Sequence, residues 1–193
     1  MWGHDIFGPE SGRAREYCAL LASTLNLTCI IPDFFRGNIP DFIPVPGGNP
    51  IPTWADTLQR DWVELLLPYL SQAGAQQVIP VGTCYGSYVV VHAAAESGGL
   101  VTGGVSIHPS HPPLMAMNGE DEAAVYRNIS SPQYFMATPG DSDTVRPGGL
   151  ASSIIQTVGS HFQQIITLAL LFCRQHLTST RLPAHTASSL AAT

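Results

Sequence analysis

The chain has 193 residues, of which 45% are hydrophobic and 11% charged, and this composition is typical of one globular domain with a substantial core. The formal net charge is −6 with no cluster of basic residues, which excludes the usual electrostatic footprint of a nucleic-acid-binding protein. The N-terminus lacks the pattern of a secretion signal and the late apolar run at 165–173 is too short to span a bilayer, so we expect a cytoplasmic protein with no membrane partner.

The first part of the chain predicts a strand end, a helix, a strand and a long loop. Residues 6–7 have the character of a strand end, and a helix is expected to open at residues 9–10. The apolar, β-branched run 27–32 predicts a buried parallel strand. Residues 33–52 are rich in Pro and Gly and therefore predict a loop.

Apolar side chains then recur at every fourth position through residues 54–70. This spacing predicts an amphipathic helix whose apolar stripe faces the core. We interpret the two tryptophans of the stripe as core residues rather than as part of a binding site. The stripe consists of Trp54, Leu58, Trp62, Leu66 and Leu70.

Three further apolar segments predict strands at residues 77–81, 101–108 and 133–137. The Ala-rich sequence that continues to Ala95 after the first of them predicts a helix. Because strands and helices alternate, we expect an α/β fold with a mostly parallel sheet flanked by helices and joined by right-handed crossovers.

Two of the connections in this half carry acidic residues. Residues 109–131 predict an irregular excursion, and we interpret its acidic cluster at 120–122 as a solvated turn or a helix start rather than as a metal site. Residues 138–149 predict a loop that follows a strand and carries Asp141 and Asp143.

The last part of the chain differs in composition from the rest. A helix is predicted at 149–158, but no acidic residue follows Asp143 and no later strand is predicted. Either this part is an apolar helix with a flexible tail, or its coding frame has departed from the ancestral one, and the sequence leaves both open. We divide the chain into a core, 1–158, and an atypical C-terminal region, 159–193.

The most specific motif lies between the strand predicted at 77–81 and the helix that follows. Gly82, Cys84 and Gly86 form the sequence Gly-x-Cys-x-Gly, the pattern of a nucleophile elbow with cysteine in the serine position. Glycine lacks a Cβ, so the strand end and the helix start can approach closely while the nucleophile is held in a strained backbone conformation. A helix N-terminus favours a thiolate. The alternative is a buried structural cysteine.

The four cysteines of the chain are widely spaced, and no Cys-x-x-Cys pair is present. This spacing argues against a zinc site and against thioredoxin-type redox chemistry. It fits a reducing compartment, and we expect neither a metal ion nor a cofactor. The cysteines are Cys18, Cys29, Cys84 and Cys173.

Five segments in order along the chain carry a further pattern. They are His-Asp-Ile-Phe-Gly at 4–8, Pro-Asp-Phe-Phe-Arg-Gly at 32–37, Gly-Thr-Cys-Tyr-Gly at 82–86, Ile-His-Pro-Ser at 107–110 and Pro-Gly-Asp-Ser-Asp-Thr-Val-Arg-Pro-Gly-Gly at 139–149. Together they resemble the dienelactone hydrolase family, the carboxymethylenebutenolidases and their relatives. The resemblance implies an α/β-hydrolase fold, incomplete because the family's strands before residue 4 are missing.

The resemblance also implies roles for individual residues. Cys84 matches the family's nucleophile, and Asp5 matches an acid, usually Glu, that helps to control ionisation of the thiol. Asp is one methylene shorter than Glu, which shortens its reach towards Cys84. The backbone N–H groups of Ile6 and Tyr85 match the oxyanion hole, the donor pair that acyl-transfer chemistry requires.

For the acid and the histidine of the triad, the resemblance leaves alternatives. Asp141 matches the triad acid, with Asp143 as the second candidate because a two-residue slip in this loop is plausible. The family's late His-Gly-Phe or His-Ser-Phe segment is replaced here by Gly-Ser-His-Phe at 159–162, so His161 is the first candidate for the base. His176 and His185 are weaker candidates.

The remaining histidines and one arginine receive other interpretations. His92 lies inside the predicted helix and is expected to pack. His108 and His111 follow a strand, but not where the family places its triad histidine. Arg36 is either a partner for a substrate carboxylate or an ordinary surface charge. The arginine that the family places after its late histidine has no match, so a preference for dienelactone is not implied.

From these features we expect a monomeric hydrolase that cleaves a small ester or lactone through Cys84, with a histidine as base and Asp141 orienting it. The alternative is a catalytically inactive, truncated hydrolase-like binding module, favoured by the missing first strands and the acid-free C-terminal region. A thiol-based redox site at Cys84 ranks last because no resolving cysteine is near in sequence.

Overall fold

The computed structural model describes residues 1–155 except 42–45 and 97–98. All described residues belong to one compact unit, Met1–Gly159. The predicted helix at 149–158 is present as α6 (Leu150–Ile155) as far as the description extends. The predicted C-terminal region, 159–193, lies outside the described residues, and with it lie His161, His176 and His185.

Four short parallel strands form the sheet, in the order β1-β2-β3-β4. They are β1 (Trp2–Gly3), β2 (Val81–Thr83), β3 (Gly104–Ile107) and β4 (Gln133–Met136). The chain is thus an α/β protein with a parallel sheet, as the alternating sequence pattern predicted. Because the strands are parallel, their carboxyl ends lie at one edge, and the residues that follow them are brought together there.

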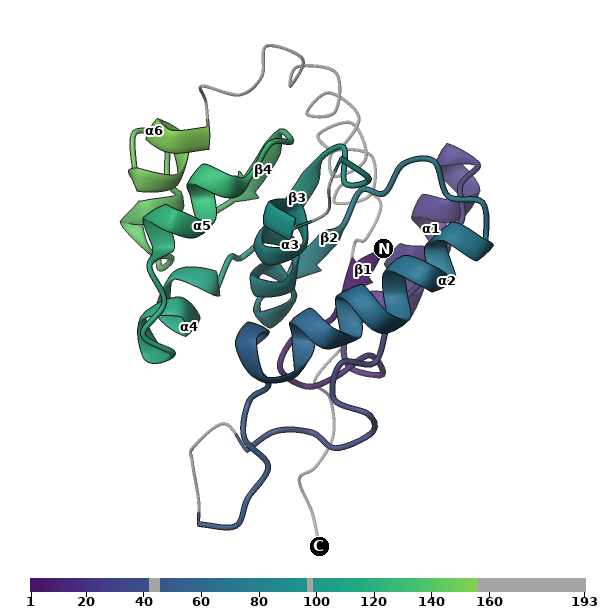
Figure 1. The fold of residues 1–193 in the computed structure, drawn as a ribbon, viewed down its shortest axis with the longest axis horizontal. Helices are drawn as coiled ribbons and strands as arrows, with labels where there is room; N and C mark the ends of the chain where they lie inside the picture. Colours follow the sequence, from purple (N-terminus) through teal and green to yellow (C-terminus); the bar gives the residue numbers. More distant parts are fainter. Residues whose placement is uncertain (42–45, 97–98, 156–193) are drawn as a thin grey trace, which may run out of the picture. The chain divides into compact units, whose positions relative to one another are not determined.

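Helix α3 (Tyr85–Glu96) is the central helix of the described part. It contacts β1, β2 and β3 of the sheet, and also α4 (His111–Met117) and α5 (Glu122–Asn128). Figure 1 shows α3 in front of β2 and β3, with α2 on one side and α5 on the other. Every residue of α3 from Tyr85 to Ala94 is buried, as is typical of a helix that is apolar on all faces.

The apolar stripe at 54–70 lies on a helical stretch that is partly π-helical. It consists of η1 (Trp54–Leu58), η2 (Asp61–Leu66) and α2 (Leu67–Gln72). An α-helix has 3.6 residues per turn, so residues four apart advance past a full turn by about 40° per step, and the wider π turns of this stretch offset that drift. Leu58 and Trp62 have no exposed side-chain surface, and burial of each stabilises the fold by roughly 1.5–3 kcal/mol. The expected amphipathic helix and the core role of its tryptophans are confirmed.

Several predicted element boundaries were wrong. The run 27–32 forms no strand, although the amide of Trp2 donates a hydrogen bond of 2.8 Å to the carbonyl of Ile30, so the run lies beside β1. Residues 6–7 lie in a turn after β1, and helix α1 (Ala14–Leu25) begins later than residues 9–10. The predicted excursion at 109–131 contains α4 and α5.

The two helices in that excursion have recognisable starts. Pro112 and Pro113 occupy the first turn of α4, where proline is tolerated because its missing N–H has no intrahelical partner. Asp121 caps α5, its side chain accepting a hydrogen bond from the amide of Ala124 at 3.1 Å. The interpretation of the acidic cluster at 120–122 as a helix start is therefore confirmed.

A disulfide joins Cys18 of α1 to Cys29, with 5.7 Å between their Cα atoms. Disulfides persist mainly in oxidising compartments, so this bond weighs against the expected reducing compartment, which stays a prediction. The bond closes a short loop of the chain and ties α1 to the segment beside β1. Cys84 is the free cysteine of the described part.

Candidate active site

The backbone of Cys84 adopts the left-handed conformation between β2 and α3, with φ at +53°. This conformation is strained for a residue with a Cβ and persists only where the surroundings enforce it. The glycines on either side make the sharp turn possible. A Cβ on Gly82 would lie 2.2 Å from the carbonyl oxygen of Gly86, and a Cβ on Gly86 would lie 2.1 Å from that of Gly3. The close approach predicted from Gly-x-Cys-x-Gly is confirmed.

Hydrogen bonds from two neighbouring elements hold Cys84 in place. Its amide donates to the carbonyl of Ile107 at 3.0 Å, which ties the turn to the end of β3. The hydroxyl of Ser87 donates to the Cys84 carbonyl at 2.6 Å. The hydroxyl of Ser110 lies 3.3 Å from Sγ of Cys84, a distance at which it donates a hydrogen bond to the sulfur. The thiol is partly exposed, so a reagent can reach it.

The backbone amides of Ile6 and Tyr85 are the candidate oxyanion donors. Ile6 is buried in the turn after β1, and Tyr85 is the first residue of α3. Within the described part of the chain, neither amide donates a hydrogen bond to a protein acceptor. An N–H without a protein partner at a helix start is the kind of donor that stabilises a developing oxyanion.

His4 fixes the segment that carries Ile6. Its Nε2 accepts a hydrogen bond from the amide of Phe34 at 3.2 Å, and its Nδ1 donates to the carbonyl of Asp5 at 2.8 Å. These partners require the neutral ring, and burial lowers the pKa of His4 in agreement. The His4 ring also contacts Tyr85 at the start of α3, so the two amides are held by a common buried cluster.

The carboxylate of Asp5 is engaged within its own turn. Its Oδ1 accepts hydrogen bonds from the amide of Phe7 at 2.9 Å and from the hydroxyl of Ser11 at 2.6 Å. The structure describes no hydrogen bond between Asp5 and Cys84. Asp5 therefore has a structural role in this turn, and the role that the resemblance implied for it stays a prediction.

Asp141 is the buried acid of the loop after β4. Its side chain is 3% exposed, whereas that of Asp143 is 92% exposed and pairs with Arg146 at 2.6 Å. Oδ2 of Asp141 accepts a hydrogen bond from the amide of Thr138 at 2.5 Å, and its carbonyl accepts one from Arg146 at 2.9 Å. Between the two candidates of the sequence, the geometry favours Asp141.

The partner of Asp141 is a histidine that the sequence analysis set aside. Nδ1 of His108 lies 2.6 Å from Oδ1 of Asp141. His108 follows β3 directly, its own backbone is left-handed with φ at +49°, and its side chain is 54% exposed. The contact depends on the alignment of β3 with β4, where Ile107 pairs with Met136. The strand predictions contained the only available signal, two chemically suitable residues after neighbouring parallel strands.

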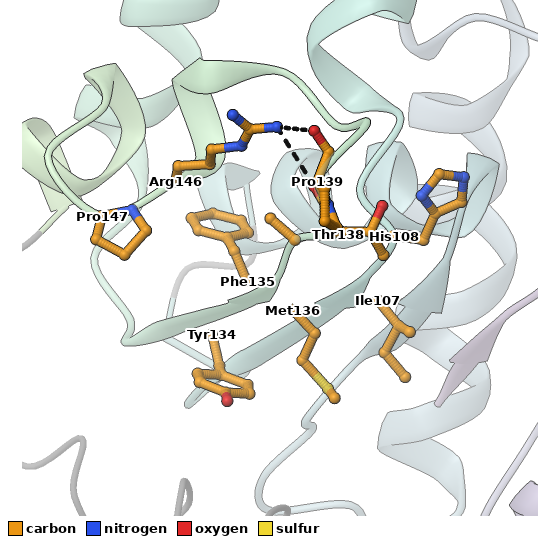
Figure 2. A pocket seen from close by; sticks show the side chains of 10 residues that line it. Ile107, His108, Tyr134, Phe135, Met136, Thr138, Pro139, Arg146 and Pro147 are labelled. Atoms are coloured by element: carbon orange, nitrogen blue, oxygen red, sulfur yellow. Dashed lines mark hydrogen bonds between the residues drawn. The ribbon is translucent and has the colours of Figure 1, made fainter.

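Figure 2 shows how the loop after β4 is held between His108 and Arg146. The guanidinium of Arg146 donates to the carbonyls of Thr138 and Pro139, and His108 lies on the other side of this turn. A cavity of about 670 Å³ borders His108 and Arg146. A second cavity, of about 580 Å³, is lined by His108, Ser110 and Asp141. His108 is thus accessible from two hollows at the carboxyl edge of the sheet.

The other buried histidines belong to the packing around α3. Nε2 of His92 lies 2.8 Å from Oε2 of Glu120, and the ring stacks on Trp54. Burial lowers the pKa of His92 and outweighs the opposing effect of Glu120. His111 is fully buried, and burial lowers its pKa to about 3. The packing role expected for His92 is confirmed.

Arg36 already has a partner of its own. Its guanidinium lies 2.5 Å from the carboxylate of Asp61, which is nearly buried. An arginine engaged in this way is less available to a substrate carboxylate.

Among the described residues no group of three or more His, Cys, Asp or Glu side chains could hold a metal ion. None of the helices described is long and apolar enough to cross a membrane.

Comparison with protein-family models, with curated proteins and with solved structures finds no match to this chain. The fold and the site geometry are therefore the observations on which a function is proposed.

Proposed function

We propose that this protein is a hydrolase of small esters or lactones that uses Cys84 as its nucleophile, with an α/β-hydrolase fold and a likeness to dienelactone hydrolases. The observation that carries the proposal is the strained, glycine-flanked backbone of Cys84 between a parallel strand and a helix. Strain of this kind, held by close backbone packing, recurs at catalytic nucleophiles and is costly in a merely structural cysteine.

Two further features support the proposal. The amides of Ile6, in the turn after β1, and of Tyr85, at the start of α3, have no protein acceptors among the described residues, as expected of an oxyanion hole. Asp141 lies in the loop after β4, at the same carboxyl edge of the parallel sheet as Cys84 after β2. Its burial and its contact with a histidine ring suit an acid that orients a base.

The proposed chemistry begins with the Cys84 thiolate attacking the carbonyl carbon of the substrate. The Ile6 and Tyr85 amides bind the oxyanion, and loss of one such donor typically costs about 10²–10³ in rate. A histidine takes the thiol proton and returns it to the leaving alcohol, and water then releases the acid from the thioester. The substrate is a small ester or lactone; the engagement of Arg36 by Asp61 gives no support to a preference for a carboxylate.

Hydrolysis of 4-nitrophenyl acetate and of dihydrocoumarin, a simple lactone, tests the proposal. Cys84→Ala is expected to lower turnover at least about 10³-fold, because the bond-forming atom is removed. Cys173→Ala is the matched control and is expected to keep turnover within about twofold. Full turnover by Cys84→Ala would sink the mechanism.

The second candidate is a hydrolase-like module that binds without turnover. Asp5 favours it, because its carboxylate is held by Phe7 and Ser11 rather than by the thiol. The two candidates separate in one assay. A chain without turnover whose Cys84 is still alkylated at different rates in the native and the denatured state is the binding module.

The cytoplasmic location predicted from the sequence stays a prediction, as does the monomeric state. The Cys18–Cys29 disulfide weighs against a reducing compartment. Alkylation of the chain in intact cells, before any reductant is added, decides the question. Free Cys18 and Cys29 thiols are expected in the cytoplasm and a retained disulfide in an oxidising compartment.

A further inference from the structure

The residues that follow β2 and β3 stand side by side in the same conformation. The last paired residues of these strands are Thr83 and Ile107, so Cys84 and His108 are the next pair in register. Both have left-handed backbones, with φ at +53° and +49°. The amide of Cys84 still donates to the carbonyl of Ile107 at 3.0 Å. Neighbouring strands lie about 4.8 Å apart, which places the two residues next to each other at the carboxyl edge.

Nδ1 of His108 is bound by a carboxylate, as in the base of a catalytic triad, although the described hydrogen bond to the Cys84 sulfur comes from Ser110 and not from this ring. With the Asp141 carboxylate 2.6 Å from Nδ1, that nitrogen carries the proton, and the neutral ring presents Nε2 as its acceptor. Asp141 is itself fixed, because its Oδ2 accepts from the Thr138 amide and its backbone is held by Arg146. The acid is buried, the ring is half-exposed, and His108 lines the two cavities beside it.

The turn after His108 folds back onto the thiol. The Ser110 hydroxyl lies 3.3 Å from Sγ of Cys84, and the Ser110 amide donates to the hydroxyl of Ser87 at 2.9 Å. Ser87 in turn donates to the Cys84 carbonyl at 2.6 Å. This chain of hydrogen bonds fixes the segment from His108 to Ser110 against the nucleophile turn.

We propose that His108, oriented by Asp141, is the base that activates Cys84, in place of the late histidine that the sequence suggested. The inference rests on the proposed function of Cys84. Within the described part of the chain, one carboxylate oxygen of Asp141 accepts a hydrogen bond from His108 and the other accepts one from Thr138. The carboxylate is therefore already bound to the His108 ring that it would orient.

The proton path through His108 balances for ester hydrolysis. Nε2 takes the proton of the Cys84 thiol, the sulfur forms a bond to the carbonyl carbon, and the carbon–oxygen bond to the alcohol breaks. The alcohol leaves with the proton from Nε2, and a thioester remains. Nε2 then takes a proton from water, whose oxygen attacks the thioester, and the proton returns to the departing sulfur. The products are one acid and one alcohol from one ester and one water.

Cross-linking of the unmodified chain tests the inference without any variant at His108. The bifunctional reagent 1,3-dibromoacetone alkylates a reactive cysteine and then bridges it to a nucleophile a few ångströms away. Peptide mass spectrometry is expected to show a bridge from Cys84 to His108. A bridge from Cys84 to His161, or single alkylation of Cys84 with no bridge, would overturn the inference.

Turnover of 4-nitrophenyl acetate supplies a second readout. His108→Gln is expected to lower turnover about 10²-fold or more, since a positioned base typically contributes 10²–10⁴-fold, and added imidazole is expected to restore part of it. His161→Gln tests the candidate that the sequence suggested, and a loss of turnover as large as that of His108→Gln would overturn the inference. Wild-type turnover by His108→Gln would overturn this inference but not the proposed function of Cys84. Turnover by Cys84→Ala would instead overturn the proposed function.

Discussion

The ends of β2 and β3 reach the same backbone conformation by different means. Cys84 and His108 both turn left-handed at matching positions in the register. At Cys84 the turn is enforced by packing, because α3 begins at once and Gly82 and Gly86 allow it to lie against the strands. At His108 no glycine is present, and the turn is held by polar contacts: the contact of the ring with the Asp141 carboxylate and a 3.0 Å hydrogen bond from the His108 amide to the carbonyl of Met136.

This difference teaches which features of a site a sequence displays. A turn enforced by packing leaves glycines at fixed offsets, and these are visible in the sequence. A turn held by a side-chain pair 33 positions apart leaves no local mark. The two strand ends should therefore respond differently to mutation. The end of β2 should be sensitive to added side-chain volume, and the end of β3 to loss of the contact between His108 and Asp141.

The largest expected effect is steric, at the end of β2. Gly86→Ala places a Cβ 2.1 Å from the backbone oxygen of Gly3, which cannot move without displacing β1. We expect a loss of about 3 kcal/mol or more in the free energy of unfolding. Urea unfolding followed by circular dichroism measures it.

Gly140→Ala is the matched control for that change. A Cβ at Gly140 meets nothing within 4 Å, so the free energy of unfolding should change by no more than about 0.5 kcal/mol. A Gly86→Ala protein as stable as the control would contradict the close packing at this turn.

A smaller effect is expected from pH, through the buried ring of His111. His111 begins α4, and its Nδ1 lies 3.4 Å from the hydroxyl of Ser87. Burial and the nearby His92 lower its pKa to about 3, below the usual value of 6.5. The unfolded chain therefore binds more protons between these values, and stability is present above about pH 6.5 and falls as the pH falls.

Each pH unit in this window costs about 1.4 kcal/mol for one such group, so His111 alone should remove about 2 kcal/mol between pH 7 and pH 5. His111→Gln, which has no titrating ring, should lose correspondingly less over the same interval. Urea unfolding at both pH values checks this. An equal loss in both proteins would mean that His111 is not buried as a neutral ring.

The smallest expected effect compares the strand ends directly. Glycine tolerates φ near +50° and alanine does not, so at both positions the glycine variant should be about 1 kcal/mol more stable than the alanine variant. The alanine variants themselves should differ. His108→Ala leaves buried Asp141 without its ring partner and should lose about 1–3 kcal/mol, whereas Cys84→Ala should lose less.

Thermal unfolding of the four variants, Cys84→Gly, Cys84→Ala, His108→Gly and His108→Ala, gives the comparison. Equal stabilities of the glycine and alanine variants at position 84 would show that the backbone of residue 84 is not strained. Equal losses for the two alanine variants would remove the polar restraint at the end of β3.

Much of the fold could be predicted because its determinants are local. The four-residue stripe from Trp54 to Leu70 marks a buried helical face, and the apolar runs around β2, β3 and β4 mark strands. The run 27–32 was read as a strand for the same reason, yet it makes only one backbone hydrogen bond to β1, from Trp2. The residues of this run are exposed or only partly buried, with Ile30 packed against the core, so apolar character predicted neither the strand pairing nor the full burial.

The features that sequence reasoning missed depend on tertiary alignment. The Cys18–Cys29 bond requires α1 to fold back on the segment after it. The His108–Asp141 pair requires the register of β3 against β4. Of the candidate site, Cys84 and Asp141 could be proposed from the sequence. The ring that contacts Asp141 could not, because the family motif pointed to His161, whereas His108 is distinguished only by its position after β3.

The most direct test of the account is to trap the acyl group on the chain. The chain is mixed briefly with 4-nitrophenyl acetate, and the reaction is then quenched with acid. Peptide mass spectrometry locates any acetyl group. The account predicts acetyl on Cys84 in the wild-type chain, absent after Cys84→Ala and absent from Cys173. Hydrolysis with acetyl on no cysteine, or acetylation that persists unchanged in the Cys84→Ala variant, would contradict the assignment of Cys84 as the nucleophile.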